Sequence, residues 1–198
     1  MKVFKVICAL FVFGFVSVSH AAVIFITEKD ANGTVTSLLG ADNVEVNNKF
    51  YNVRFLDGSC TSLFDGCNAL SDFLFHTEAD ALAATFSLLD QVFISGTRFD
   101  RRPELTNGCS AKLKCIIDTP WERTKQLRFQ SVAVFNYDPG GNDIWKNATA
   151  KITKDWGEFP ERTYAVWSKP VEASAPGTAM VLLMGIAGLI VSQRRKQA

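Results

Sequence analysis

The chain has 198 residues, of which 47% are hydrophobic and 12% aromatic, and it carries 21 Lys and Arg against 20 Asp and Glu. This apolar content suffices for a folded core and excludes a disordered chain. All twenty acidic residues but only sixteen basic ones lie between residues 22 and 172, so this stretch has a net charge of −4, which excludes a general nucleic-acid-binding protein. Only the two ends are continuously apolar, which excludes a polytopic membrane protein.

The first 21 residues have the pattern of a secretory signal peptide. Lys2 and Lys5 precede an apolar stretch at residues 6–18, and Ser19-His20-Ala21 follows it. Positive charge, a short apolar stretch and small residues at the −3 and −1 positions predict cleavage between Ala21 and Ala22. The alternative is a membrane anchor that stays attached, for which this apolar stretch is short.

Residues 22–172 have the length of one domain, and we expect them to form a single exported globular domain. Two hairpin signals, Asn32-Gly33 and Asn47-Asn48, each lie between β-type segments. Apolar alternation and turn signals predict strands at residues 22–27, 34–39, 43–46, 49–57, 113–117, 126–137, 148–153 and 162–167.

One helix is predicted at about residues 77–95. Thr77 is a candidate N-cap with Asp80 three residues later, and Gly96 is placed to end the helix. The apolar stripe that recurs at helical spacing, and that we expect to face the core, consists of Leu82, Phe86, Leu89 and Phe93. Because strands outnumber helices, the predicted fold class is α+β, with a mainly antiparallel β domain and one main amphipathic helix.

The last part of the chain, residues 173–198, has the pattern of a membrane anchor. A linker-like segment at residues 173–177 precedes thirteen apolar residues at 179–191, and Arg194, Arg195 and Lys196 follow. We expect a transmembrane helix at about residues 178–192, extended by snorkelling of the two arginines. The alternative is a buried core helix, but such a helix would carry polar residues on one face, and this one has none.

The order of these parts resembles the PEP-CTERM sorting signal of exported bacterial proteins. The matching residues are Ala175, Pro176, Gly177 and Thr178, then the apolar stretch, then Arg194, Arg195 and Lys196. Ser174-Ala175-Pro176 stands where the family has Pro-Glu-Pro, so only the second proline is kept.

This resemblance implies a route and a set of partners. The general secretion machinery and signal peptidase would export the domain, with the C-terminal helix holding it in the inner membrane. An exosortase-type membrane protease would then process the tail and deliver the protein to the cell surface or the extracellular matrix.

Four cysteines remain after removal of the signal: Cys60, Cys67, Cys109 and Cys115. An even number in an exported chain implies disulfides, and three pairings are possible. Short local loops close easily, so we favour Cys60–Cys67 with Cys109–Cys115. The rival interpretation is a zinc site, but the usual spacing of two to four residues between ligands is absent.

A second resemblance covers most of the middle of the chain. The segments at residues 44–60, 63–67, 105–109 and 163–168 are similar to an uncharacterised domain found in other PEP-CTERM proteins. This resemblance implies a disulfide-bonded exported domain and no particular activity.

Sites for chemistry are mostly missing from the sequence. His76 is the one histidine that remains after signal removal, and no G-x-S-x-G, P-loop or Rossmann pattern occurs. The segment Asp138-Pro-Gly-Gly-Asn142-Asp143 could bend around a calcium ion, but a plain turn is the simpler interpretation. We therefore predict no catalytic residue, no metal and no cofactor.

Two functions stay open at this point. The first is a non-enzymatic structural or binding role outside the cell. The alternative is an exported hydrolase acting on extracellular polysaccharide through paired carboxylates, which a cleft with two acids and nearby exposed tryptophans would favour.

Overall fold

The structure is a computed structural model that describes residues 22–138 and 143–171. The predicted signal peptide, the sorting motif at Ala175–Thr178 and Arg194–Lys196, and the predicted transmembrane helix lie outside the described residues. Within the described ranges, no helix is long and apolar enough to cross a membrane.

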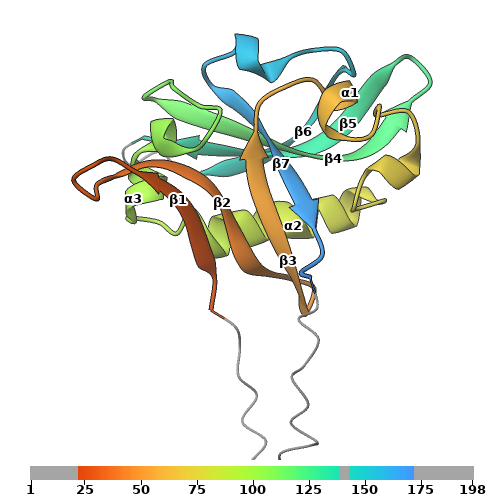
Figure 1. Cartoon of the computed structure of the whole chain (residues 1–198). Coiled ribbons are helices and arrows are strands. Elements are labelled where there is room, and N and C mark those ends of the chain that lie inside the picture. The colour runs from red at the N-terminus through yellow and green to blue at the C-terminus, as the bar shows by residue number, and fades with distance from the viewer. Residues whose placement is uncertain (1–21, 139–142, 172–198) are drawn as a thin grey trace, which may run out of the picture.

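The described residues form one seven-stranded sheet with the strand order β1-β2-β3-β7-β4-β5-β6 (Figure 1). The strands are β1 (Ile24–Lys29), β2 (Val35–Val46), β3 (Lys49–Leu56), β4 (Lys114–Thr124), β5 (Arg128–Tyr137), β6 (Ile144–Lys151) and β7 (Arg162–Ser168). Strands β1–β3 and β4–β6 each form an antiparallel meander, and β7 lies between them. Since β7 pairs antiparallel with β3 and parallel with β4, five of the six pairings are antiparallel, and the predicted α+β class is confirmed.

Both predicted hairpins in the first half are present. In the β1–β2 turn, the Asp30 carboxylate accepts from the backbone N–H of Asn32 and Thr34, and Gly33 has a φ of 78°. In the β2–β3 turn, Asn47 and Asn48 have φ values of 50° and 60°. Two successive residues with positive φ are typical of the type I′ turn, whose twist matches that of the flanking strands.

Strand β2 joins two segments that the sequence separated. It runs without a break through residues 40–42, and a register shift between Ala41 and Val44 takes up the mismatch with β3. A Cβ on Gly40 would collide with the backbone carbonyl oxygen of Val53, so only glycine permits this close pairing. The expected loop is therefore an irregular strand segment.

Strand β4 is also longer than predicted. It extends past Ile117 to Thr124, with a register shift between Pro120 and Glu122. Proline has no N–H to give to the ladder, so an irregular position is where a strand tolerates it.

Helix α2 (Glu78–Gln91) is the one long helix among the described residues; the others are α1 (Cys60–Leu63), η1 (Leu70–Asp72), α3 (Arg98–Arg101), η2 (Pro103–Leu105) and η3 (Trp156–Glu158). Thr77 is its N-cap, as predicted, and accepts from the Asp80 N–H at 3.1 Å. The helix ends four residues earlier than predicted, because the N–H groups of Val92 and Phe93 both donate to the Leu88 carbonyl. Gly96, with a φ of 81°, belongs to the next turn.

The predicted core stripe is confirmed for Phe93, which is buried in the core, and for Leu82 and Leu89, which pack against it, but it is wrong for Phe86. The buried residues of α2 are mainly small: Ala81, Ala84, Thr85, Ser87 and Leu88. Leu82 and Leu89 are half-buried, and Phe86 is 41% exposed. Small residues face the sheet because the helix packs across β2, β4 and β5, where large side chains of the strands already fill the space.

Two hydrophobic clusters lie on opposite faces of the sheet. Successive side chains of β7 point to opposite faces of the sheet. Ala165 and Trp167 therefore belong to the cluster under α2. Tyr164 and Val166 belong to the cluster under α1 and η3. Figure 1 shows α1 and α2 on opposite sides of the strands. Each cluster contains one cysteine pair, Cys109 and Cys115 in the first and Cys60 and Cys67 in the second.

A buried ion pair joins β7 to the second meander. Asp118 on β4 is fully buried, and its Oδ2 lies 3.0 Å from Arg162 Nη2 on β7. Its Oδ1 accepts from the Ser131 hydroxyl of β5 at 2.7 Å, and the guanidinium lies over the Trp156 ring. Burial raises the pKa of Asp118, against the opposing effect of the Arg162 charge.

Arg162→Met should lower the free energy of unfolding by roughly 3–5 kcal/mol, because it leaves the Asp118 carboxylate buried without its partner. Chemical denaturation measures this loss. The matched control is Arg102→Met, which removes an ion pair at 2.9 Å that is largely open to water, and which should cost less than about 1 kcal/mol. Equal losses in the two variants would contradict the role assigned to the buried pair.

Candidate functional site

Both predicted disulfides are present. Cys60 and Cys67 have a Cα–Cα distance of 5.5 Å, and Cys109 and Cys115 one of 5.7 Å. These values lie within the range that a disulfide permits. With all four sulfurs in two separate bonds, the zinc interpretation fails, and the described residues hold no group of three or more metal-ligating side chains.

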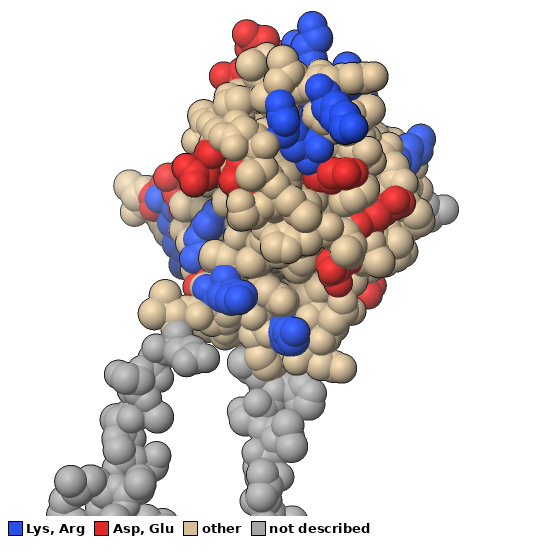
Figure 2. Space-filling view, turned by 90° about the vertical axis from the view of Figure 1, so that its right-hand side faces the viewer, with Lys and Arg blue, Asp and Glu red and all other residues tan. Residues whose placement is uncertain are grey.

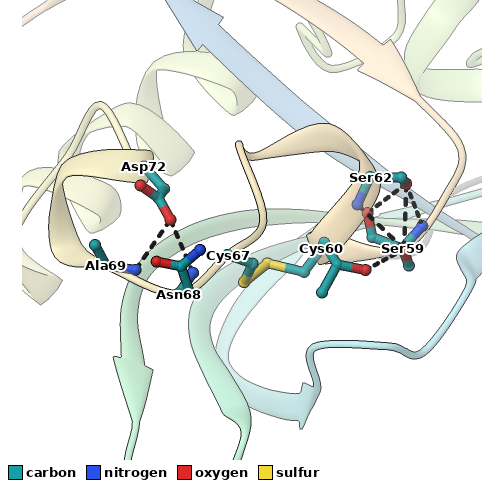
Figure 3. Close-up of a disulfide and its surroundings, with 8 residues drawn as sticks. Ser59, Cys60, Ser62, Cys67, Asn68, Ala69 and Asp72 are labelled. Atoms are coloured by element: carbon teal, nitrogen blue, oxygen red, sulfur yellow. Dashed lines mark hydrogen bonds between the residues drawn. A yellow bond between two sulfur atoms is a disulfide. The ribbon is translucent and has the colours of Figure 1, made fainter.

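Local hydrogen bonds hold both ends of the first disulfide loop (Figure 3). On one side, Ser59 and Ser62 form a reciprocal cap at the start of α1. On the other, Asp72 Oδ2 accepts from the N–H groups of Ala69 and Asn68 at 2.9 and 2.8 Å. These bonds, that from Ala69 first, lower the pKa of Asp72. The loop is therefore a rigid cover for the second hydrophobic cluster.

Opening either disulfide should destabilise the domain by about 2 kcal/mol, since each closes a loop of only a few residues. The variants are Cys60→Ala/Cys67→Ala and Cys109→Ala/Cys115→Ala, compared by denaturant unfolding with and without reductant. Reductant should lower the free energy of unfolding of the wild type by about the sum of the losses in the two variants. In each variant it should lower this free energy only by the contribution of the disulfide that remains. A wild type with the same unfolding curve in the presence and absence of reductant would contradict the assignment of the disulfides.

The first of two acidic clefts, the Asp57 cleft, has a volume of about 350 Å³. Its lining residues are Asp57, Gly108, Cys109, Ser110, Gly157, Glu158, Phe159 and Pro160. Partial burial, together with the nearby charge of Asp155, raises the pKa of Asp57. Asp155 itself is held in place, since its Oδ1 accepts from the Gly157 N–H at 2.8 Å.

The Asp57 cleft lies where three of the segments quoted for the second resemblance meet. Asn107 Nδ2 donates to the Phe55 carbonyl at 2.6 Å, which ties the segment at residues 105–109 to the end of β3. Gly108 has a φ of 86°, and a Cβ there would collide with the side chains of Asp57 and Thr163. These residues therefore have a structural role, the close packing of two loops on β7, that accounts for their types without any chemistry.

The second, the Asp143 cleft, has a volume of about 380 Å³ and lies between the end of α2 and the start of β6. It is lined by Leu89, Asp90, Phe93, Ile94, Ser95, Asp100 and Asp143. Asp143 Oδ1 accepts from the Tyr137 N–H at 2.9 Å, whereas its Oδ2 is buried without a hydrogen-bond partner. Desolvation, with a smaller effect of the Asp100 charge, raises the pKa of Asp143 to about 6.

An exposed aromatic pair lies close in the chain to residues that line the Asp143 cleft. Trp145 is the second residue of β6, and Asp143 immediately precedes this strand. The Trp145 ring contacts that of Phe86, one turn before Asp90 on α2, at 5.8 Å between centroids. Trp145 is 39% exposed, whereas Trp156 and Trp167 are buried in the two clusters. Phe86, predicted as a core residue, is thus part of a surface.

The remaining sequence candidates do not form a site. The His76 ring nitrogen Nε2 hydrogen-bonds to the Phe73 carbonyl at 2.9 Å, and the described residues contain no Ser–His or Cys–His pair. Ser59 caps α1. Of the possible calcium loop, residues 139–142 lie outside the described ranges.

Asp143→Asn should make the domain more stable at about pH 7 but not at about pH 4. The pKa of about 6 in the folded protein exceeds that of an unfolded chain, so the native state binds the proton more tightly. The resulting stability is present below about pH 4 and is lost as the pH rises through about 6. Asparagine keeps the acceptor for Tyr137 and does not titrate.

Melting temperatures across this pH window measure the effect. The control is Asp90→Asn, which removes a water-exposed carboxylate from the same cleft and should leave the wild-type pH dependence in place. An Asp143→Asn variant that follows the wild-type curve would contradict the assignment.

No family model matches the chain, and neither a curated protein nor a solved structure matches it. Sequence reasoning missed Asp57 because carboxylates are common, and only the tertiary structure supplies the burial and the Asp155 charge that raise its pKa. It missed Asp100 because only the fold brings this residue into the Asp143 cleft. The run of small residues in α2, at Ala81, Ala83, Ala84 and Ser87, was the signal that could have placed Phe86 outside the core.

Proposed function

We propose that the chain is an exported bacterial protein with a C-terminal sorting signal and a non-enzymatic structural or binding role. The general secretion machinery exports the chain, signal peptidase removes its N-terminal signal, and an exosortase-type protease processes its tail. The domain is held at the inner membrane by the C-terminal helix before processing, and then reaches the cell surface or the extracellular matrix.

The observation that carries this proposal is the pair of disulfides, both buried in the domain. Structural disulfides persist in oxidising compartments and are rare in the cytosol. A domain that depends on two of them is suited to work outside the cytoplasm. The signal-like N-terminus and the tripartite tail support the same route.

Deleting residues 179–198 should release the domain from the membrane fraction without unfolding it. The apolar stretch at residues 179–191 has no polar face for water, so lipid is its favourable environment. Cell fractionation and thermal melting measure the two effects. Leu183→Arg, which adds about 3 kcal/mol to the insertion free energy near the helix centre, should release the chain as well. A truncated protein that loses its cooperative melting transition would show that the helix belongs to the core.

The Asp143 cleft favours the alternative, a hydrolase acting on extracellular polysaccharide. Asp143, with a pKa of about 6, has the property of a general acid near neutral pH, and Asp100 supplies a second carboxylate. The exposed ring of Trp145 offers an apolar face for a sugar.

Release of reducing ends from β-linked glucans and from poly-N-acetylglucosamine by the purified full chain tests this alternative. Asp143→Asn should lower the rate by about a hundredfold or more, whereas Glu158→Gln in the Asp57 cleft should leave it unchanged. A wild type that releases no reducing ends from these polymers would contradict the hydrolase.

A further inference from the structure

The two ends of the described chain lie at the same end of the domain. Ile24 of β1 pairs with Asp42 near the end of β2, and Asn43 Nδ2 donates to the Ala22 carbonyl at 3.4 Å. Ser168 of β7 pairs with Asn52 near the start of β3. Residues 22 and 171 are therefore both at the end of the sheet where the β2–β3 hairpin turns (Figure 1). We call this end the base of the domain.

A groove of about 510 Å³ opens at the base, and it is lined by Lys49, Phe50, Tyr51, Lys169 and Pro170. We call it the basal groove. After Ser168 the chain continues beside the first residues of β3, so the two walls are the start of one strand and the exit of another. The groove thus lies directly beside the point from which the predicted anchor leaves.

The basal groove combines apolar surface with positive charge. Among the described residues, its lining contains two lysines, both exposed, and no acidic residue. Val171, the last described residue, is 91% exposed. Figure 2 shows basic side chains set in uncharged surface at the lower end of the domain, although the stretch from residue 22 to 172 has an excess of acidic residues.

We propose that the basal groove binds the anionic surface of the bilayer that holds the tail, so that the domain stands on its base before processing. The proposal rests on the membrane anchor of the proposed function. Lysine heads attract anionic headgroups while their stems cover apolar surface, and aromatic rings such as those of Phe50 and Tyr51 are favoured at the membrane interface.

The length of the connection keeps the groove close to lipid. Seven residues, 172–178, separate Val171 from the apolar stretch, and they span at most about 25 Å when fully extended. A tethered surface meets the membrane at a high effective concentration, so two lysines and an apolar groove suffice for a contact that would be weak without the tether.

Lysine labelling of the full chain, reconstituted in vesicles of phosphatidylcholine with or without phosphatidylglycerol, tests the proposal. Flotation first establishes that the chain is in the membrane. Acetylation of Lys49 and Lys169 should be about fivefold slower in the anionic vesicles, and this protection should disappear in about 1 M salt. Lys29, at the end of β1, and Lys112, just before β4, are exposed at the opposite end of the sheet and are the internal controls.

Two double variants separate the effect of the basal lysine charges from the effect of the membrane anchor. In Lys49→Glu/Lys169→Glu, hydroxyl-radical oxidation of Phe50 in anionic vesicles should rise to the level found in neutral ones. In Lys29→Glu/Lys112→Glu, which has the same net charge, it should stay at the wild-type level.

The outcomes distinguish the two proposals. A chain that floats with vesicles but shows equal labelling of Lys49 and Lys169 in both lipids overturns the basal contact and leaves the anchor intact. Protection that is equal in neutral vesicles and in detergent also overturns it, because the chain itself would then cover the groove. A chain that does not float overturns both.

Discussion

The ion pair between Asp118 and Arg162 is the contact on which the rest of the fold depends. It spans the junction between β7 and β4, which pair through three parallel Cα pairs and so connect the two halves of the sheet. Parallel pairing between distant segments has little local support, so side chains must supply specificity there. A buried charge excludes alternative registers, because any slip of β7 against β4 would leave Asp118 or Arg162 buried without a partner.

The same junction organises both faces of the sheet. On one face, Arg162 lies over Trp156, whose ring also packs near Tyr164 and Phe129, and the Cys60–Cys67 loop closes over this aromatic cluster. On the other face, Trp167 donates from Nε1 to Thr119 Oγ1 beneath α2. Each layer therefore has its own disulfide and its own link to the central strands.

The surface features divide between the rim and the base of the domain. The Asp57 and Asp143 clefts are bordered by loops at strand ends. The pKa values of Asp57 and Asp143 are raised because these carboxylates are partly desolvated and lie near like charges. The basal groove carries the opposite charge and lies where the chain leaves the domain. In the membrane contact proposed above, the lysines of the base would face the anionic lipid and the clefts of the rim would face away from it.

Local features of the fold could be predicted from the sequence, whereas long-range ones could not. The Asn47-Asn48 turn, the Thr77 cap and the two short disulfide loops depend on residues a few positions apart, whose backbone preferences act within one segment. The insertion of β7 between the meanders, the continuity of β2 through Gly40, and the exposure of Phe86 depend on partners far along the chain. The same holds for the clefts, since a pKa rises only where the tertiary structure removes water and brings a second charge near.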